Sequence, residues 1–301
     1  MPVNESFRVA VIGAGPAGIA AAIQLRRQGL EPLLLEKERP GGLLRQARWV
    51  ENYPGFPAGI SGPDLADLFW EQAAAFDLEW LKAEVLSLES RQKSIILNTT
   101  AGGFTAARLV LASGSRPRAL PAKLNDPQLA GLVLQDLNRV RTAPGRSIAV
   151  LGSGDAAFDY ALNLAGSGCR VFILLRGASE KCLSMLAGLC RNNRNIEILY
   201  RSPLVGVCRS SGDGLLLFLG SKKEELEVDA LLAAIGRQAE DSLLRGMDNE
   251  NRRRLLAEKK IISAGDVKNG RLRQTALAVG DGIRAAMIVA CRIKRNKEKQ
   301  A

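Results

Sequence analysis

The hydrophobic pattern of the chain predicts strands and helices that alternate. Residues 7–37 read as an apolar strand, a glycine turn, a helix that stops at Gly29 and a second apolar strand that ends in Glu36. This order is that of a βαβ unit, whose two strands lie parallel. Residues 147–177 repeat the same plan. The sequence therefore predicts two βαβ units in one chain of 301 residues.

Shorter alternating strands follow each unit. Residues 78–120 alternate between apolar and polar around Gly and Thr turns, which predicts an antiparallel hairpin leading into a buried strand at 109–112. Residues 215–238 echo this arrangement and close with Ala-Ile-Gly, where the first half closes with Ala-Ser-Gly. Residues 259–293 give a strand, a turn and a long helix with an apolar face. They are too few for a domain, so we expect them to pack on the first half.

These elements predict an α/β fold with two nested Rossmann-like three-layer (ββα) dinucleotide-binding domains. We expect one domain to comprise residues 1–116 and 242–301, with residues 117–241 inserted as the second domain. At 47% apolar residues, the chain can bury a full core.

Composition excludes several classes of chemistry. The chain has no histidine, which removes the commonest general base and metal ligand. Its five cysteines are odd in number and never two residues apart, so we expect neither a disulfide framework nor a metal site. No apolar run approaches the length of a membrane span, and the first residues lack the basic leader and the small-residue cleavage site of a signal peptide. We therefore expect a cytoplasmic protein that does not bind membranes.

The formal net charge of +11 is concentrated toward the end of the chain. Residues 237–301 contain 16 Lys and Arg against 8 Asp and Glu. Such a surface suits nucleic acid, an anionic nucleotide or an acidic protein partner, whereas a merely solvated tail and helix face is the alternative. We expect no nucleic-acid partner.

The first turn, "GAGPAG", has the glycine spacing of a dinucleotide-binding turn. Gly13 allows the tight bend, Gly15 lets backbone N–H groups approach a pyrophosphate, and Gly18 allows the helix to pack closely on the strand. The positive end of the helix then faces the phosphates. Glu36, 23 residues after Gly13, is placed to accept hydrogen bonds from a ribose.

The second turn, "GSGDAA", keeps Gly152 and Gly154 but has Ala157 in place of the third glycine. The same 23-residue step reaches Leu175, so the ribose-binding acid is missing, and Arg176 follows it. An arginine here suits the 2′-phosphate of NADP, although an ordinary surface arginine is the alternative. Two such sites indicate a prosthetic flavin at one and a visiting nicotinamide nucleotide, which brings a hydride, at the other.

Several further segments carry a resemblance to a known family. They are "GGLL" and "ENYPG" within residues 41–69, "LVLASGSRPRAL", "VDALLAAIGR" and "SAGDVKNGRLRQTALAVGDGIRAAM". With the two glycine turns, they resemble the low-molecular-weight thioredoxin reductases and the ferredoxin/flavodoxin-NADP reductases of the same architecture. The resemblance implies a homodimeric FAD enzyme that uses NADPH or NADH, with the nucleotide domain inserted into the FAD domain.

By this resemblance, Asp266 would bind the ribitol chain of FAD, and Arg273, Gln274 and Ala276 would line the isoalloxazine. A helix N-terminus beside this ring stabilises the negative charge of its reduced form. The full FAD set is Gly13, Gly15, Pro16, Ala17, Gly18, Glu36, Lys37, Gly42, Leu43, Asn52, Val85, Ala112, Ser113, Gly114, Gly265, Asp266, Arg273, Gln274, Thr275 and Ala276. The NAD(P) set is Gly152, Gly154, Asp155, Ala156, Arg176, Ile235 and Gly236. No side chain is expected to be catalytic, because flavin N5 carries the hydride.

Three features depart from the family. Thioredoxin reductases carry a Cys-x-x-Cys pair just before the second turn, where residues 130–147 contain no cysteine, and Asp136-Leu137 there resemble the ferredoxin/flavodoxin-NADP reductases. The family's His-Arg-Arg for the 2′-phosphate reads Leu-Arg-Gly at 175–177, which leaves the coenzyme open. Residues 247–267 are shorter and more basic than the family's hairpin.

Cys182 and Cys190 lie about two turns apart in a helix-like stretch, and we expect them to be structural thiols.

The sequence thus predicts an NAD(P)H oxidoreductase in which FAD passes electrons to an external acceptor. A small acidic redox protein such as ferredoxin or flavodoxin is the preferred acceptor, attracted by the basic C-terminal region. One alternative is a divergent thioredoxin-reductase-like enzyme acting on an external disulfide or small molecule. Another is a non-enzymatic flavoprotein or nucleotide sensor.

Overall fold

A computed structural model of the chain describes residues 3–91, 94–220 and 224–298. It divides into two compact units. The first contains Met1–Arg45, Val50–Arg116 and Gln238–Ala301, and the second contains Gln46–Trp49 and Pro117–Arg237. The expected inserted segment ended at residue 241, whereas the second unit ends at Arg237 and includes a tetrapeptide from far earlier in the chain.

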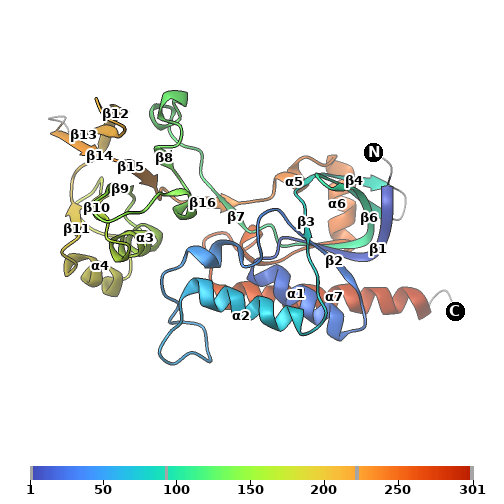
Figure 1. Cartoon of the computed structure of the whole chain (residues 1–301). Helices are drawn as coiled ribbons and strands as arrows, with labels where there is room; N and C mark the ends of the chain where they lie inside the picture. The colour runs from blue at the N-terminus through green and yellow to red at the C-terminus, as the bar shows by residue number, and fades with distance from the viewer. Residues whose placement is uncertain (1–2, 92–93, 221–223, 299–301) are drawn as a thin grey trace. The chain divides into compact units, whose positions relative to one another are not determined.

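The first unit is built on a seven-stranded sheet (Figure 1). Its path is β3 (Leu81–Lys82), β2 (Pro32–Glu36), β1 (Val3–Ile12), β6 (Gly102–Leu111), β5 (Ser94–Thr99) and β4 (Val85–Arg91), and β17 (Ile261–Ser263) pairs with β6. The central strands β2, β1, β6 and β17 are parallel, and Ile12 lies opposite both Leu35 and Leu111. Their carboxyl ends therefore meet at one edge of the sheet, where the first glycine turn begins.

Helices cover one face of this sheet. In Figure 1, α1 (Pro16–Arg27) and α7 (Thr275–Glu298) run side by side beneath the strands, with α2 (Gly62–Ala74) beside α1. Apolar residues of β1, α1 and α7 form one core, and the strands, α5 (Ser242–Arg245) and α6 (Asn249–Ala257) enclose a second core. The last strand and helix pack on the first half, which confirms that prediction.

The second unit repeats the plan. Its parallel sheet has the order β11 (Ile196–Leu199), β10 (Arg170–Leu174), β9 (Ser147–Leu151), β15 (Ala230–Ala233) and β8 (Val133–Leu134). Its helices are α3 (Asp155–Gly166) and α4 (Ser184–Arg191). A separate antiparallel sheet is made of β12 (Leu204–Arg209), β13 (Leu215–Leu219) and β14 (Glu224–Val228). The predicted pair of βαβ units, each with its antiparallel element, is therefore confirmed.

Hydrogen bonds explain why Gln46–Trp49 belongs to the second unit. The buried Gln46 side chain accepts from the Tyr160 hydroxyl at 3.1 Å and donates to Asp136 Oδ1 at 2.8 Å. The backbone N–H of Arg48 donates to Asp159 Oδ2 at 2.9 Å. Burial raises the pKa of the Asp159 carboxyl, against this hydrogen bond, which lowers it. The tetrapeptide thus fills hydrogen-bonding sites on α3 that local sequence does not reveal.

The structure corrects one local prediction. Cys182 was expected to share a helix with Cys190, but α4 begins at Ser184, after Cys182. The backbone N–H of Leu183 donates to Asp155 Oδ1 at 2.8 Å, which holds this residue against α3 with a non-helical backbone (φ −56°, ψ 135°). Among the described helices, none is both long and apolar enough to cross a membrane.

Candidate nucleotide-binding sites

The first glycine turn joins β1 to α1. Gly13 has a φ of +94°, and a Cβ there would lie 2.4 Å from the carbonyl oxygen of Ala112. A Cβ on Gly18 would lie 1.7 Å from the carbonyl oxygen of Gly13. Real Cβ atoms do not approach backbone so closely, so these two glycines are required for α1 and β6 to meet at the turn.

Gly15, between them, has a different reason for lacking a side chain. Its backbone is extended, with φ −73° and ψ −177°, which any residue adopts. A Cβ there would meet nothing within 4 Å. The protein itself therefore does not require glycine at this position. The open space lies at the N-terminus of α1, whose cap uses no side chain, and this is where a phosphate group gains most from backbone N–H groups.

Glu36 is fixed against this turn. Its carboxylate accepts from the backbone N–H of Ala14 at 2.8 Å and from that of Glu38 at 3.0 Å. An ionised carboxylate has about four acceptor sites, so both oxygens can still accept from ribose hydroxyls. The acid thus stands ready beside the turn, at the end of β2.

The segment after β2 meets the same turn, and it also reaches the residue that precedes α7. The backbone N–H of Gly41 donates to the Ala14 carbonyl at 2.7 Å, and a Cβ on Gly42 would lie 3.2 Å from the Cα of Gly15. Asn52 Nδ2 donates to Gln274 Oε1 at 2.9 Å, although these residues are 222 positions apart. The structure therefore brings together segments that the sequence analysis grouped only by resemblance.

The remaining residues of the FAD set lie around this edge of the first unit. Arg273 directly precedes Gln274, and its Nε atom is buried without a hydrogen-bond partner among the described residues. The backbone N–H of Ala83 donates to the Glu36 carbonyl at 2.9 Å, two residues before the predicted contact residue at the start of β4. The others occupy the first turn of α1, the exit of β2, the 3-10 helix η1 (Gly42–Gln46), the start of β4 and the start of α7: Pro16, Ala17, Lys37, Leu43, Val85, Thr275 and Ala276.

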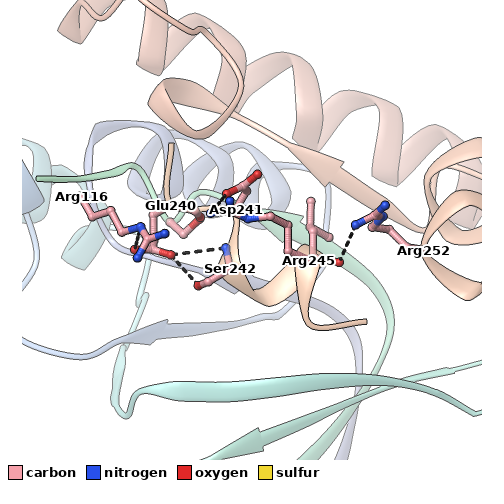
Figure 2. A network of polar contacts seen from close by, with 8 residues as sticks. Arg116, Glu240, Asp241, Ser242, Arg245 and Arg252 are labelled. Atoms are coloured by element: carbon pink, nitrogen blue, oxygen red, sulfur yellow. Dashed lines mark hydrogen bonds and ion pairs between the residues drawn. The ribbon is translucent and has the colours of Figure 1, made fainter. Parts of the chain in front are cut away.

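A polar network fixes the loop that follows β6, as Figure 2 shows. The Ser113 hydroxyl donates to the Glu240 carbonyl, and the Glu240 backbone N–H donates to the Gly114 carbonyl at 3.0 Å. The Glu240 carboxylate pairs with Arg116 Nε at 3.4 Å and accepts from the Ser242 hydroxyl. In the same view Arg245 pairs with Asp241 and Arg252 donates to the Leu244 carbonyl, so the loop is tied to the start of α5. Ser113 and Gly114 are thus held where β6 ends.

The second glycine turn repeats the geometry of the first. A Cβ on Gly152 would lie 2.5 Å from the carbonyl oxygen of Ala234, as one on Gly13 would meet Ala112. Gly154 has an extended backbone, with φ −96° and ψ 178°, and a Cβ there would meet no atom within 4 Å. Asp155 and Ala156 begin α3, while Ile235 and Gly236 follow β15 beside the turn.

The loop after β10 folds back onto this turn. The position where an acid would bind the ribose holds Leu175, whose side chain is fully buried. Arg176, the next residue, is exposed. The Lys181 N–H donates to the Ser153 carbonyl at 2.7 Å. Lys181 is a second exposed cation whose backbone is joined to the turn. Sequence reasoning missed it because a lysine five residues beyond Arg176 is placed there only by the path of the loop.

Comparison with known proteins agrees with this geometry. The model of the family "Pyridine nucleotide-disulphide oxidoreductase" matches residues 7–282. The chain belongs to this family. It is 28% identical over 294 residues to the thioredoxin reductase of Borreliella burgdorferi, covering 93% of this chain and 90% of that protein. It is also 28% identical to a Clostridium pasteurianum protein named "34.2 kDa protein in rubredoxin operon", covering 96% of this chain and 97% of that one.

Among solved structures, Lactococcus lactis thioredoxin reductase has the same fold. The TM-score is 0.82 at 23% identity, with 96% of this chain and 99% of that chain covered. The protein is thus a thioredoxin-reductase-like, FAD-dependent pyridine nucleotide oxidoreductase. The first unit suits FAD by its own geometry, because Gly15 leaves open space at the N-terminus of α1 and because the buried Nε of Arg273 still has a hydrogen bond to donate.

Proposed function

We propose that the first unit holds FAD through the residues gathered at the carboxyl edge of β1, and that the second unit binds NADPH or NADH. The observation that carries this proposal is the pair of open glycines, Gly15 and Gly154, each at a helix N-terminus beside a sterically required glycine. Bound FAD would supply a hydride acceptor for the nicotinamide and an electron donor for a second substrate. The protein's residues bind and orient both nucleotides.

The second substrate is proposed to be an external electron carrier. Residues 130–147 contain no cysteine, and the five cysteines of the chain lie at other positions, all of them free thiols. Without a dithiol at that place, the acceptor must approach the flavin itself. The name of the Clostridium relative, which places it in a rubredoxin operon, supports a small redox protein as this acceptor.

We propose that this carrier is acidic, as ferredoxins and flavodoxins are, and docks on the loop before α7. Leu272 is 72% exposed there, beside the exposed Arg271 and next to Arg273. A large exposed apolar residue among cations suits an acidic protein with an apolar centre. The cations at the far end of α7 suit it less, because the helical rise places Arg292 about 25 Å along α7 from Thr275.

Self-association is proposed as well. Large apolar side chains are exposed on the helix-covered face of the first unit: Leu68 on α2 and Leu277, Ile283 and Met287 on α7. Burying such residues between two copies would remove them from water. A homodimer is therefore the expected form, which light scattering of the purified protein tests. Five free cysteines are in keeping with the proposed cytoplasmic location.

Anaerobic titration tests the proposed function. NADPH and NADH are added in parallel to the flavin-loaded protein, and flavin bleaching is followed before and after addition of ferredoxin, flavodoxin, thioredoxin or a small disulfide. Bleaching followed by carrier reduction supports the proposal. Reduction of thioredoxin or the small disulfide alone supports the alternative enzyme, and absence of bleaching by either coenzyme supports a nucleotide sensor.

A further inference from the structure

Asp281 joins α7 to the loop that precedes it. Its carboxylate lies in the second turn of α7, with a side chain only 12% exposed. Oδ1 pairs with Lys268 Nζ at 2.8 Å, and Oδ2 accepts from Asn269 Nδ2 at 2.7 Å and from the Gly265 N–H at 3.4 Å. Arg284, from α7 itself, also pairs with Oδ1 at 2.8 Å. One carboxylate therefore has three partners in residues 265–269.

These three partners begin the loop that carries the proposed flavin contacts. The loop runs from the end of β17 at Ser263 to the start of α7 at Thr275. Asp266 lies beside Gly265 at one end, and Arg273 and Gln274 lie at the other. Asp281 fixes the first end directly, and the second end is continuous with the helix that carries Asp281. Asp281 therefore ties the first end of the loop to the helix that continues from its second end.

Close backbone packing fixes α7, which carries Asp281, against α1. A Cβ on Gly282 would lie 2.1 Å from the carbonyl oxygen of Ala17, so α7 contacts the first turn of α1 directly. A Cβ on Gly265 would lie 2.8 Å from the Cβ of Ala17. The carboxylate is thus anchored against the helix that begins at the first glycine turn, and it transmits that position to the loop.

The charge of Asp281 suits this task. Burial alone would raise the pKa of its carboxyl, but hydrogen bonds from Lys268 and Asn269 and the charge of Lys268 hold that pKa below its ordinary value. The side chain is therefore an acceptor only, as its surrounding donors require. Asparagine would point an NH2 group toward at least one of those donors.

We propose that Asp281 is a positioning residue for FAD, which holds residues 265–274 in register with the first glycine turn. This inference rests on the proposed assignment of that turn and loop to FAD. A displaced loop would alter both the retention of FAD and the surroundings of its ring, because Arg273, Gln274 and the N-terminus of α7 would shift together.

The test compares Asp281→Asn and Lys268→Gln with the control Arg284→Gln. Arg284 pairs with the same oxygen as Lys268 at the same distance but does not belong to the loop. Flavin-loaded enzyme is diluted and released FAD is followed by its fluorescence. We expect the dissociation constant to rise about tenfold or more in Asp281→Asn and several-fold in Lys268→Gln, and to change less than twofold in Arg284→Gln.

The bound flavin gives a second measurement. We expect a shifted visible spectrum and reduction potential in Asp281→Asn and Lys268→Gln, because a merely destabilised protein would lose flavin without altering the flavin that stays bound. Wild-type spectrum and potential in both variants would overturn the inference. If Asp281→Asn does not fold, Lys268→Gln, at an exposed residue, decides. Failure of the wild-type protein to bind FAD would instead overturn the proposed function.

Discussion

A side chain at Gly152 would lie 2.5 Å from the carbonyl oxygen of Ala234. The same relationship holds in the first unit, where a side chain at Gly13 would lie 2.4 Å from the Ala112 carbonyl. In both units the first glycine lets a neighbouring strand end close against the turn. The next glycine of each turn faces open space instead, so the two glycines of one motif serve different needs, the fold and the ligand.

This difference predicts what Gly15→Val does. The backbone at Gly15 accepts any residue and a Cβ has room, so the variant should fold normally. The valine side chain would occupy the space for the pyrophosphate, and the purified protein should be largely colourless. Flavin absorbance per protein and the circular dichroism spectrum check this. A folded variant with full flavin would contradict the assignment.

Gly154→Val is the matched variant in the second unit, where the backbone is equally permissive. It should retain FAD and lose flavin reduction by NADPH and NADH, while a chemical reductant such as dithionite still bleaches the flavin. Gly13→Val, which meets the Ala112 carbonyl, should instead lower the thermal midpoint of the whole protein.

The coenzyme preference should depend on two cations of one loop. Arg176→Ala and Lys181→Ala each remove an exposed positive charge beside the second turn. A charge-assisted hydrogen bond to phosphate contributes about 1.5 to 3 kcal/mol, so each variant should raise the KM for NADPH about tenfold to a hundredfold. The KM for NADH, which has no 2′-phosphate, should hardly change. Equal changes for both coenzymes would assign the cations another role.

Local patterns predicted the parts of the fold that depend on neighbouring residues. Glycine spacing and apolar runs predicted both turns and the strands around them, because these elements are set within about thirty residues. The family resemblance assigned Asn52 and Gln274 separately to FAD, but their contact was not predicted, since no periodicity links residues so far apart. Lys181 and Gln46 were missed, because a loop path and a partner helix place them. The helix start after Cys182 depends similarly on Asp155.

Electron uptake should stop at the flavin. With no cysteine in residues 130–147, titration should saturate near two electrons per FAD, whereas a flavin with an active disulfide would take about four. Burial, and then the charges of Cys182 and Asp159, raise the pKa of Cys190 to about 12, so this thiol stays protonated and unreactive at neutral pH. Alkylation should therefore leave carrier reduction unchanged. Loss of turnover after modification of Cys182 would reveal a thiol relay at a new position.

Acidification should remove the contribution of Asp281 to stability. Its folded-state pKa lies below the ordinary value of about 3.9, so the unfolded chain takes up the proton first. The contribution is complete above the unfolded pKa and is lost as pH falls through the folded pKa. The difference in thermal midpoint between wild type and Asp281→Asn should thus be constant near neutral pH and shrink below about pH 4. A difference independent of pH would mean that the charge is not its source.

The docking of the acceptor separates two groups of cations on the same unit. Arg271→Glu and Leu272→Ser alter the exposed loop before α7, and each should raise the KM for an acidic carrier while flavin reduction by NADPH keeps its rate. A reversed charge repels the partner, and the effect should weaken as salt shortens the screening length below about 10 Å.

Arg292→Glu and Lys294→Glu make equal changes of charge on α7, but the helix places them about 25 Å from its flavin end. An electron carrier bound there would not meet the flavin, so these variants should leave the KM nearly unchanged at physiological salt. Stopped-flow reduction of ferredoxin or flavodoxin at two salt concentrations measures all four variants. If the KM for the carrier rose more in Arg292→Glu and Lys294→Glu than in Arg271→Glu, the docking surface would instead lie at the far end of α7.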